Sequence, residues 1–62
     1  MGIDKVAVIN TVAVYSRYNR LMTPRELGQT CAELGFGYAN PYYDPDEAVA
    51  FLDYWIGYQQ SI

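Results

Sequence analysis

Residues 23–35 read Thr-Pro-Arg-Glu-Leu-Gly-Gln-Thr-Cys-Ala-Glu-Leu-Gly, and this stretch decides the fold of the chain. Thr23 can cap a helix, Pro24 suits the first helical position, and Glu26 can close a capping box. Gly35 supplies the left-handed residue with which helices commonly end. The stretch therefore predicts a helix over residues 24–34.

The spacing of apolar residues in this helix indicates which side is buried. Leu27, Thr30, Cys31 and Leu34 recur at intervals of three or four residues, which places them on one face. Gly28 weakens a helix by about 1 kcal/mol relative to alanine. We interpret its presence as room for a second helix to approach closely.

A second helix start follows a loop that contains two glycines and Asn40-Pro41. Asp44 can cap this helix, and Asp46 and Glu47 fall in its first turn, where the helix dipole favours acids. The pattern predicts a helix over 45–60 with Asp46, Asp53 and Gln60 on the wet side. Two apolar rows are predicted to be buried, Val49, Leu52 and Ile56 in one and Ala48, Phe51, Trp55, Tyr58 and Ile62 in the other.

Residues 3–21 favour a helix with apolar contacts on two sides. One stripe at helical spacing holds Ile3, Ala7, Val14, Tyr18 and Leu21, and the other holds Val8, Val12 and Tyr15. The alternative is a β-hairpin, because the valines at 6, 8, 12 and 14 are β-branched. Its turn would be Asn10-Thr11, which lacks the glycine that tight hairpins prefer.

Together these signals predict one all-α domain over residues 1–62, a three-helix bundle with helices at about 3–21, 24–34 and 45–60. The alternative fold is an α+β domain with an N-terminal β-hairpin.

The small size of the chain favours self-association. A chain of 62 residues buries little apolar surface, and small proteins compensate with disulfides, metals or oligomerisation. Cys31 is the single cysteine and there is no histidine, which excludes an internal disulfide and the usual zinc ligands. We therefore expect a homodimer or larger assembly, formed through Val8, Val12, Tyr15, Trp55 and Tyr58.

The residue types argue against catalysis. General acid–base chemistry near neutral pH most readily uses histidine, which is absent. Helix capping already explains Asp44, Asp46 and Glu47, and Cys31 lies on an apolar helix face without a histidine to activate it. We predict a protein that is not an enzyme and that has no catalytic residues, cofactor or metal.

The aromatic content favours protein binding. Seven tyrosines and one tryptophan are more than one small core is expected to hide, and interfaces favour these residues. The predicted function is a regulatory or accessory module that binds a protein partner through aromatic and acidic surface. The predicted contact residues are Tyr38, Tyr42, Tyr43, Asp46, Asp53 and Tyr54, with the tyrosines exposed.

The uneven charge supplies two alternative functions. All four basic residues lie in the first 25 positions, which carry a net charge of +3, whereas the remainder carries −6. A helix-turn-helix-like protein would bind nucleic acid through the basic half, at Arg17, Tyr18, Arg20 and Arg25. The acidic start of the next helix opposes this reading, because it would repel phosphate. The other alternative is an inhibitor of the phage type that occupies a basic surface on its target.

The sequence also predicts a location. No apolar run approaches the roughly 20 residues that span a bilayer. The first residues lack the basic start and apolar stretch of a signal peptide. We expect a cytoplasmic protein that does not insert into membranes.

Overall fold

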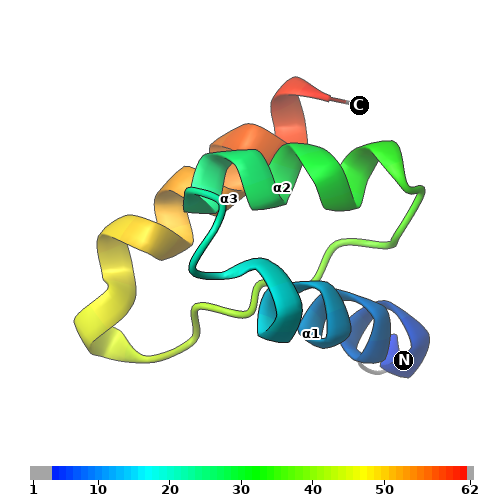
Figure 1. Ribbon diagram of the computed structural model, residues 1–62, viewed down its shortest axis with the longest axis horizontal. Helices are drawn as coiled ribbons and strands as arrows, with labels where there is room; N and C mark the ends of the chain where they lie inside the picture. The colour runs from blue at the N-terminus through cyan, green and yellow to red at the C-terminus, as the bar shows by residue number, and fades with distance from the viewer. Residues whose placement is uncertain (1–3, 62) are drawn as a thin grey trace.

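The computed structural model describes residues 4–61 and shows a small helical bundle (Figure 1). Its helices are α1 (Lys5–Tyr18), α2 (Pro24–Glu33) and α3 (Ala48–Gln60), and a 3-10 turn, η1 (Pro45–Glu47), precedes α3. No strand occurs among the described residues. The all-α prediction is confirmed, and the α+β alternative is wrong.

The hairpin alternative fails because α1 continues through Asn10 and Thr11 without a turn. The carboxylate of Asp4 begins this helix by accepting hydrogen bonds from the amides of Val6 and Ala7, both at 3.1 Å. Such a cap satisfies amides that have no partner within the helix. The valines thus adopt the helical conformation despite their preference for strands.

Helix α1 is shorter than predicted. It ends at Tyr18, and the next residues form a turn in which the side-chain amide of Asn19 donates to the Tyr15 carbonyl at 2.8 Å. Leu21 therefore leaves the helix and becomes exposed. Ile3 and Ile62, which were predicted on apolar rows, lie outside the described residues.

Helix α2 begins and ends as predicted, apart from one residue at its end. Thr23 and Glu26 form the capping box, with Glu26 N donating to Thr23 Oγ1 at 3.2 Å and Thr23 N donating to Glu26 Oε1 at 2.8 Å. Gly35 adopts a φ of 80° just beyond the helix. Leu27 and Cys31 are buried, but Leu34 is exposed because it caps the end of the helix and does not face α3.

Helices α2 and α3 pack so closely that glycine is required on both. A Cβ at Gly28 would collide with the carbonyl oxygen of Tyr54 and lie 2.8 Å from the amide nitrogen of Tyr58. A Cβ at Gly57 would collide with the carbonyl oxygen of Arg25. The close approach predicted at Gly28 is confirmed, and Gly57 is its counterpart on α3.

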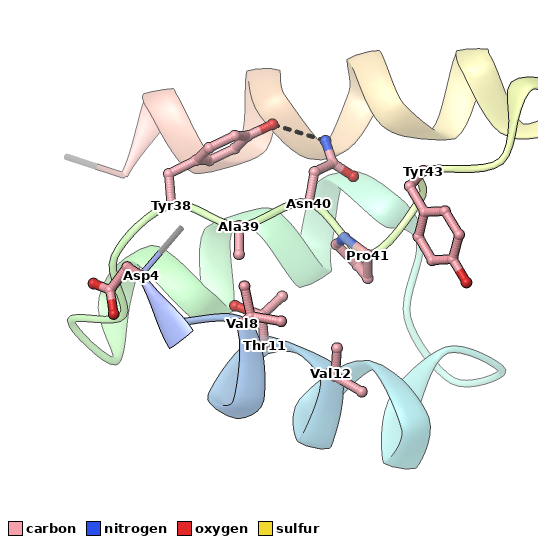
Figure 2. Close-up of a pocket in the computed structure, with 9 residues that line it drawn as sticks. All are labelled: Asp4, Val8, Thr11, Val12, Tyr38, Ala39, Asn40, Pro41 and Tyr43. Atoms are coloured by element: carbon pink, nitrogen blue, oxygen red, sulfur yellow. Dashed lines mark hydrogen bonds between the residues drawn. The ribbon is translucent and has the colours of Figure 1, made fainter. Parts of the chain in front are cut away.

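The loop between α2 and α3 forms a layer of its own. Residues 36–44 run between α1 on one side and α3 on the other (Figures 1 and 2). Tyr42 from this loop is buried and its ring lies 5.2 Å from that of Tyr15 on α1 and 6.1 Å from that of Tyr54 on α3. The buried cluster joins α2, the loop and α3 and consists of Leu27, Cys31, Tyr42, Tyr54 and Tyr58, with Tyr15 of α1 packed against it.

Helix α3 turns inward only part of one predicted row, since Tyr58 is buried and Trp55 is half-buried, but Ala48 and Phe51 are exposed. Tyr54 and Gly57 are buried against α2, whereas Val49, Leu52 and Ile56 point outward and are exposed. The prediction that Val49, Leu52 and Ile56 form a buried row was wrong, because α3 is apolar on most sides and its pattern does not single out one face. The inward face includes Gly57, where the lack of a side chain lets the backbone of α2 approach closely.

Candidate protein-binding groove

An open groove of about 570 Å³ lies between α1 and the loop that precedes η1 (Figure 2). Its volume falls within the range of about 300–1,000 Å³ that is typical of ligand pockets. The residues that line it are Asp4, Val8, Thr11, Val12, Tyr38, Ala39, Asn40, Pro41 and Tyr43.

The wall that α1 supplies is mainly apolar. Val8, Thr11 and Val12 are spaced by three and then one residue, so one side of the helix presents all three toward the loop (Figure 2). Thr11 is deepest, with 1% of its surface exposed, and its hydroxyl has no hydrogen-bond partner. Val8 is half-buried and Val12 is exposed, so both offer apolar surface to a ligand.

Asn40 holds the opposite wall in place. Its side-chain amide nitrogen donates to Tyr38 Oη at 2.8 Å and to the carbonyl oxygen of Phe51 on α3 at 3.0 Å. Its side-chain oxygen accepts from the amide of Tyr42 at 3.0 Å. The bond to Phe51 ties the loop to α3 and the other two brace the loop itself, so the wall is fixed before any ligand arrives. Pro41, which is buried, adds further rigidity.

The two ends of the groove differ in chemistry. Asp4 lies at one end and contributes the single charged side chain of the lining. Tyr43 lies at the other end with 87% of its surface exposed (Figure 2). A bound molecule would therefore meet a carboxylate, then aliphatic surface, then an aromatic ring.

The structure brings together residues that the sequence assigned to two separate surfaces. Tyr38 and Tyr43 were predicted to bind a partner, and Val8 and Val12 were predicted to mediate self-association. All four line this groove. Tyr38 turns its ring toward α3, where it packs edge-on against Trp55 at 4.7 Å, so Tyr43 is the more accessible of the two tyrosines (Figure 2).

Two of the tyrosines predicted to be exposed are buried. Tyr42 retains 6% of its surface and Tyr54 none, so the prediction of exposure was wrong for both. Both are buried because the loop layer separates α1 from α3, and these large side chains fill the space between the two helices. Tyr54 and Tyr42 meet there, beside Cys31.

The other residues predicted for self-association offer less surface than expected. Tyr15 and Trp55 are half-buried beside the core. Tyr58 is buried, and its hydroxyl donates to the carbonyl oxygen of Phe36 at 2.6 Å. Tyr58 is thus buried, as its place on a predicted apolar row indicates, and it offers little surface for self-association.

The acidic residues predicted for partner binding lie elsewhere. Asp46 is exposed on η1. Asp53 is half-buried on α3 and pairs with Arg25 on α2 at 3.4 Å. Neither residue lines the groove.

The four residues of the nucleic-acid alternative do not share one free surface. Arg17 and Arg20 are exposed, but Tyr18 packs partly against the core. Arg25 is engaged with Asp53. Aromatic stacking on a base needs a free ring face, which Tyr18 presents only in part.

Sequence reasoning missed five of the residues that line the groove. They are Asp4, Thr11, Ala39, Asn40 and Pro41. Asp4 was detectable as a capping residue before a helical segment. The role of Asn40 could not be detected in the sequence, because its hydrogen bonds to Phe51 and Tyr42 depend on how the loop crosses α3.

Two further kinds of site are absent from residues 4–61. No group of three His, Cys, Asp or Glu side chains in that range could hold a metal ion. No helix there is long and apolar enough to cross a membrane.

Burial changes the acidity of two core tyrosines. It raises the pKa of Tyr42 from the ordinary 10.0 to about 12, with smaller contributions from the negative potential of Tyr15 and Glu47. Burial, with the neighbouring Cys31 thiol, also raises the pKa of Tyr54, against a smaller opposing effect of the Thr11 hydroxyl. Both phenols therefore stay neutral in the folded state at pH values where the unfolded chain ionises.

We expect the free energy of unfolding to fall as the pH rises above about 10. The folded pKa is higher than the unfolded one, so this stability is fully present below pH 10 and is lost above it. The slope should approach about 1.4 kcal/mol per pH unit for each buried tyrosine. Urea unfolding between pH 8 and 11 measures it. Tyr42→Phe should make the slope shallower and Tyr43→Phe should not, and equal slopes in both variants would contradict the assignment.

Comparisons with protein-family models, with curated proteins and with solved structures found no match to this chain.

Proposed function

We propose that this protein is a non-catalytic interaction module that binds a peptide segment of a partner protein in the groove between α1 and residues 38–43. The observation that carries the proposal is the groove itself, which is open, mainly apolar and fixed on one wall by the three bonds of Asn40. A wall that is ordered in advance lowers the entropic cost of binding.

The lining defines the chemistry of the partner segment. Val8 and Val12 offer apolar contact to one or two aliphatic or aromatic side chains. Tyr43 offers a nearly free ring, which is the kind of residue that anchors interfaces. Asp4 favours a lysine or arginine at the other end of the segment. The preferred partner is therefore an apolar peptide with a basic residue at one end.

The same lining argues against a nucleic acid in the groove. Its single charged side chain is the carboxylate of Asp4, which would repel phosphate. The exposed basic residues Arg17 and Arg20 do not line it. A polyanion has no positive surface there to neutralise its charge.

Retention of a partner by a tagged form of this protein tests the proposal. In extract from the native source, we expect the tagged protein to retain a protein partner that survives nuclease treatment. Val12→Asp places a charge on the apolar wall and should reduce retention at least about tenfold, which corresponds to about 1.4 kcal/mol. Mass spectrometry identifies and quantifies the retained protein.

Leu21→Asp is the matched control, because it introduces the same charge at an exposed apolar residue outside the groove. It should leave retention unchanged. Equal retention by the Val12→Asp variant and the unmodified protein would overturn the groove as the binding site. Loss of retention after nuclease treatment would instead favour a nucleic-acid ligand at Arg17 and Arg20.

A further inference from the structure

The outward face of α3 is an uncovered apolar stripe. Val49, Leu52 and Ile56 recur at intervals of three and four residues on the side opposite the buried Tyr54 and Gly57. Val49 is 75% exposed and Leu52 is 56% exposed. We call Val49, Leu52 and Ile56 the α3 stripe.

Helix α1 carries a stripe of the same spacing on its own outward face. Val6, Ile9 and Ala13 lie opposite the buried Ala7 and Thr11. Val6 is 66% exposed and Ile9 is 67% exposed. We call Val6, Ile9 and Ala13 the α1 stripe. Each stripe spans eight residues, so its first and last residues lie about 10.5 Å apart along the helix at 1.5 Å per residue.

The charges beside the two stripes are opposite. Lys5 and Arg17 lie at the two ends of the α1 stripe, and both are exposed. Asp46 and Glu47 precede the α3 stripe in η1. Within residues 4–61, none of these four side chains takes part in an ion pair of the molecule.

We infer that copies of this chain associate head to tail, with the α1 stripe of one copy packed antiparallel on the α3 stripe of the next. The antiparallel arrangement covers both apolar stripes. It also brings Arg17, near the end of α1, beside Asp46 and Glu47 at the start of α3. Opposite charges across an interface fix its orientation.

The position of the two stripes decides the kind of assembly. Helices α1 and α3 lie on opposite sides of the loop layer, so their outward faces point away from each other (Figures 1 and 2). Two different surfaces on opposite sides form a heterologous contact, which builds a ring or an open chain. Assembly should therefore continue beyond the dimer.

The balance of buried and exposed apolar residues supports another copy of this chain as the molecule that covers the two stripes. Among the described residues, eleven large apolar side chains are exposed, whereas six apolar residues are buried. Soluble monomers rarely leave contiguous apolar patches of this kind, and chains of this size commonly gain stability by oligomerisation. This inference involves different surfaces from the groove and does not depend on the proposed function.

Sedimentation velocity over a range of micromolar concentrations tests the arrangement. We expect the mass of the unmodified protein to rise with concentration past that of a dimer. Ile9→Asp places a charge in the middle of the α1 stripe, and Leu52→Asp does the same in the α3 stripe. Each variant alone should therefore sediment as a monomer. An equimolar mixture should form a heterodimer and stop there, because each variant keeps the one stripe that the other has lost.

Three outcomes would overturn the inference. The unmodified protein could remain a monomer at all concentrations, or the mixture of the two variants could remain monomeric. The third outcome is that the Ile9→Asp variant forms a dimer through paired α3 stripes. Circular dichroism verifies that both variants are folded. Tyr43→Ser, in the groove, should assemble normally, which separates a failure of this inference from a failure of the proposed function.

A charge exchange provides a second test that leaves the apolar stripes intact. Arg17→Glu should weaken assembly, and so should Asp46→Arg. The double variant should restore it, because the two changed side chains then meet with exchanged signs. Weaker assembly in the double variant than in either single variant would contradict the antiparallel arrangement.

Discussion

Gly28→Ala is expected to lower the free energy of unfolding by about 3 kcal/mol. The new methyl group would collide with the carbonyl oxygen of Tyr54 and lie 2.8 Å from the amide nitrogen of Tyr58. Both are backbone atoms of α3, so relief requires the two helices to move apart. A chain of this length has a total stability of roughly 3–9 kcal/mol, so the loss would leave the fold marginal or unfold it.

The sign of this effect separates packing from helix propensity. In a helix without close neighbours, replacing glycine by alanine stabilises the helix by about 1 kcal/mol. Helix propensity alone therefore predicts that Gly28→Ala raises the free energy of unfolding. Urea unfolding followed by circular dichroism measures the change. Gly57→Ala should give a similar loss, because its methyl group would meet the carbonyl oxygen of Arg25. The exposed Gln59→Ala is the control, and a stabilised Gly28→Ala variant would show that the helices are not in close contact.

Tyr54→Ala should destabilise the protein by about 4 kcal/mol, the largest loss expected from truncating a single side chain. Tyr54 has no exposed surface and is the largest fully buried side chain among the described residues. Its ring contacts both the loop layer, through Tyr42, and the buried face of α2, through Leu27 and Cys31. Removing it opens a cavity where α2, α3 and the loop meet.

Tyr54→Phe is the matched control for this prediction. The hydroxyl of Tyr54 is buried without a hydrogen-bond partner, and so is that of Thr11. Removing an unpaired buried hydroxyl is neutral or stabilises by up to about 1 kcal/mol, because its desolvation cost disappears. Urea unfolding of both variants measures the difference. A loss of more than about 1 kcal/mol in Tyr54→Phe would show that this hydroxyl is hydrogen-bonded in solution.

The local signals in the sequence predicted the helix starts well. Capping depends on residues within one turn, so Thr23 and Glu26 identify the start of α2 without knowledge of the rest of the fold. Asp44 caps the 3-10 turn η1, where its carboxylate accepts from the Asp46 amide at 3.0 Å, but α3 begins three residues later than predicted, at Ala48. Gly35 likewise marks the end of α2 through its own backbone conformation.

The candidate site could be predicted only in part. Val8, Val12, Tyr38 and Tyr43 were each identified as binding residues, but the sequence did not place them together. Their meeting depends on the path of residues 36–44 between α1 and α3, which the side chain of Asn40 fixes through a bond to α3. A contact between a loop and a helix eleven residues later leaves no periodic pattern in the sequence.

The sequence by itself determined that this protein is helical, because caps and glycine stops act over three or four residues. Tertiary structure alone decided which face of each helix is covered. Helix α3 is apolar on most sides, so its periodicity allowed several buried faces. The backbones of α2 and α3 approach each other closely at Gly28 and Gly57. This contact buries Tyr54 and leaves the α3 stripe uncovered. Burial depends on which surfaces can come within contact distance, and that is a property of the packed helices.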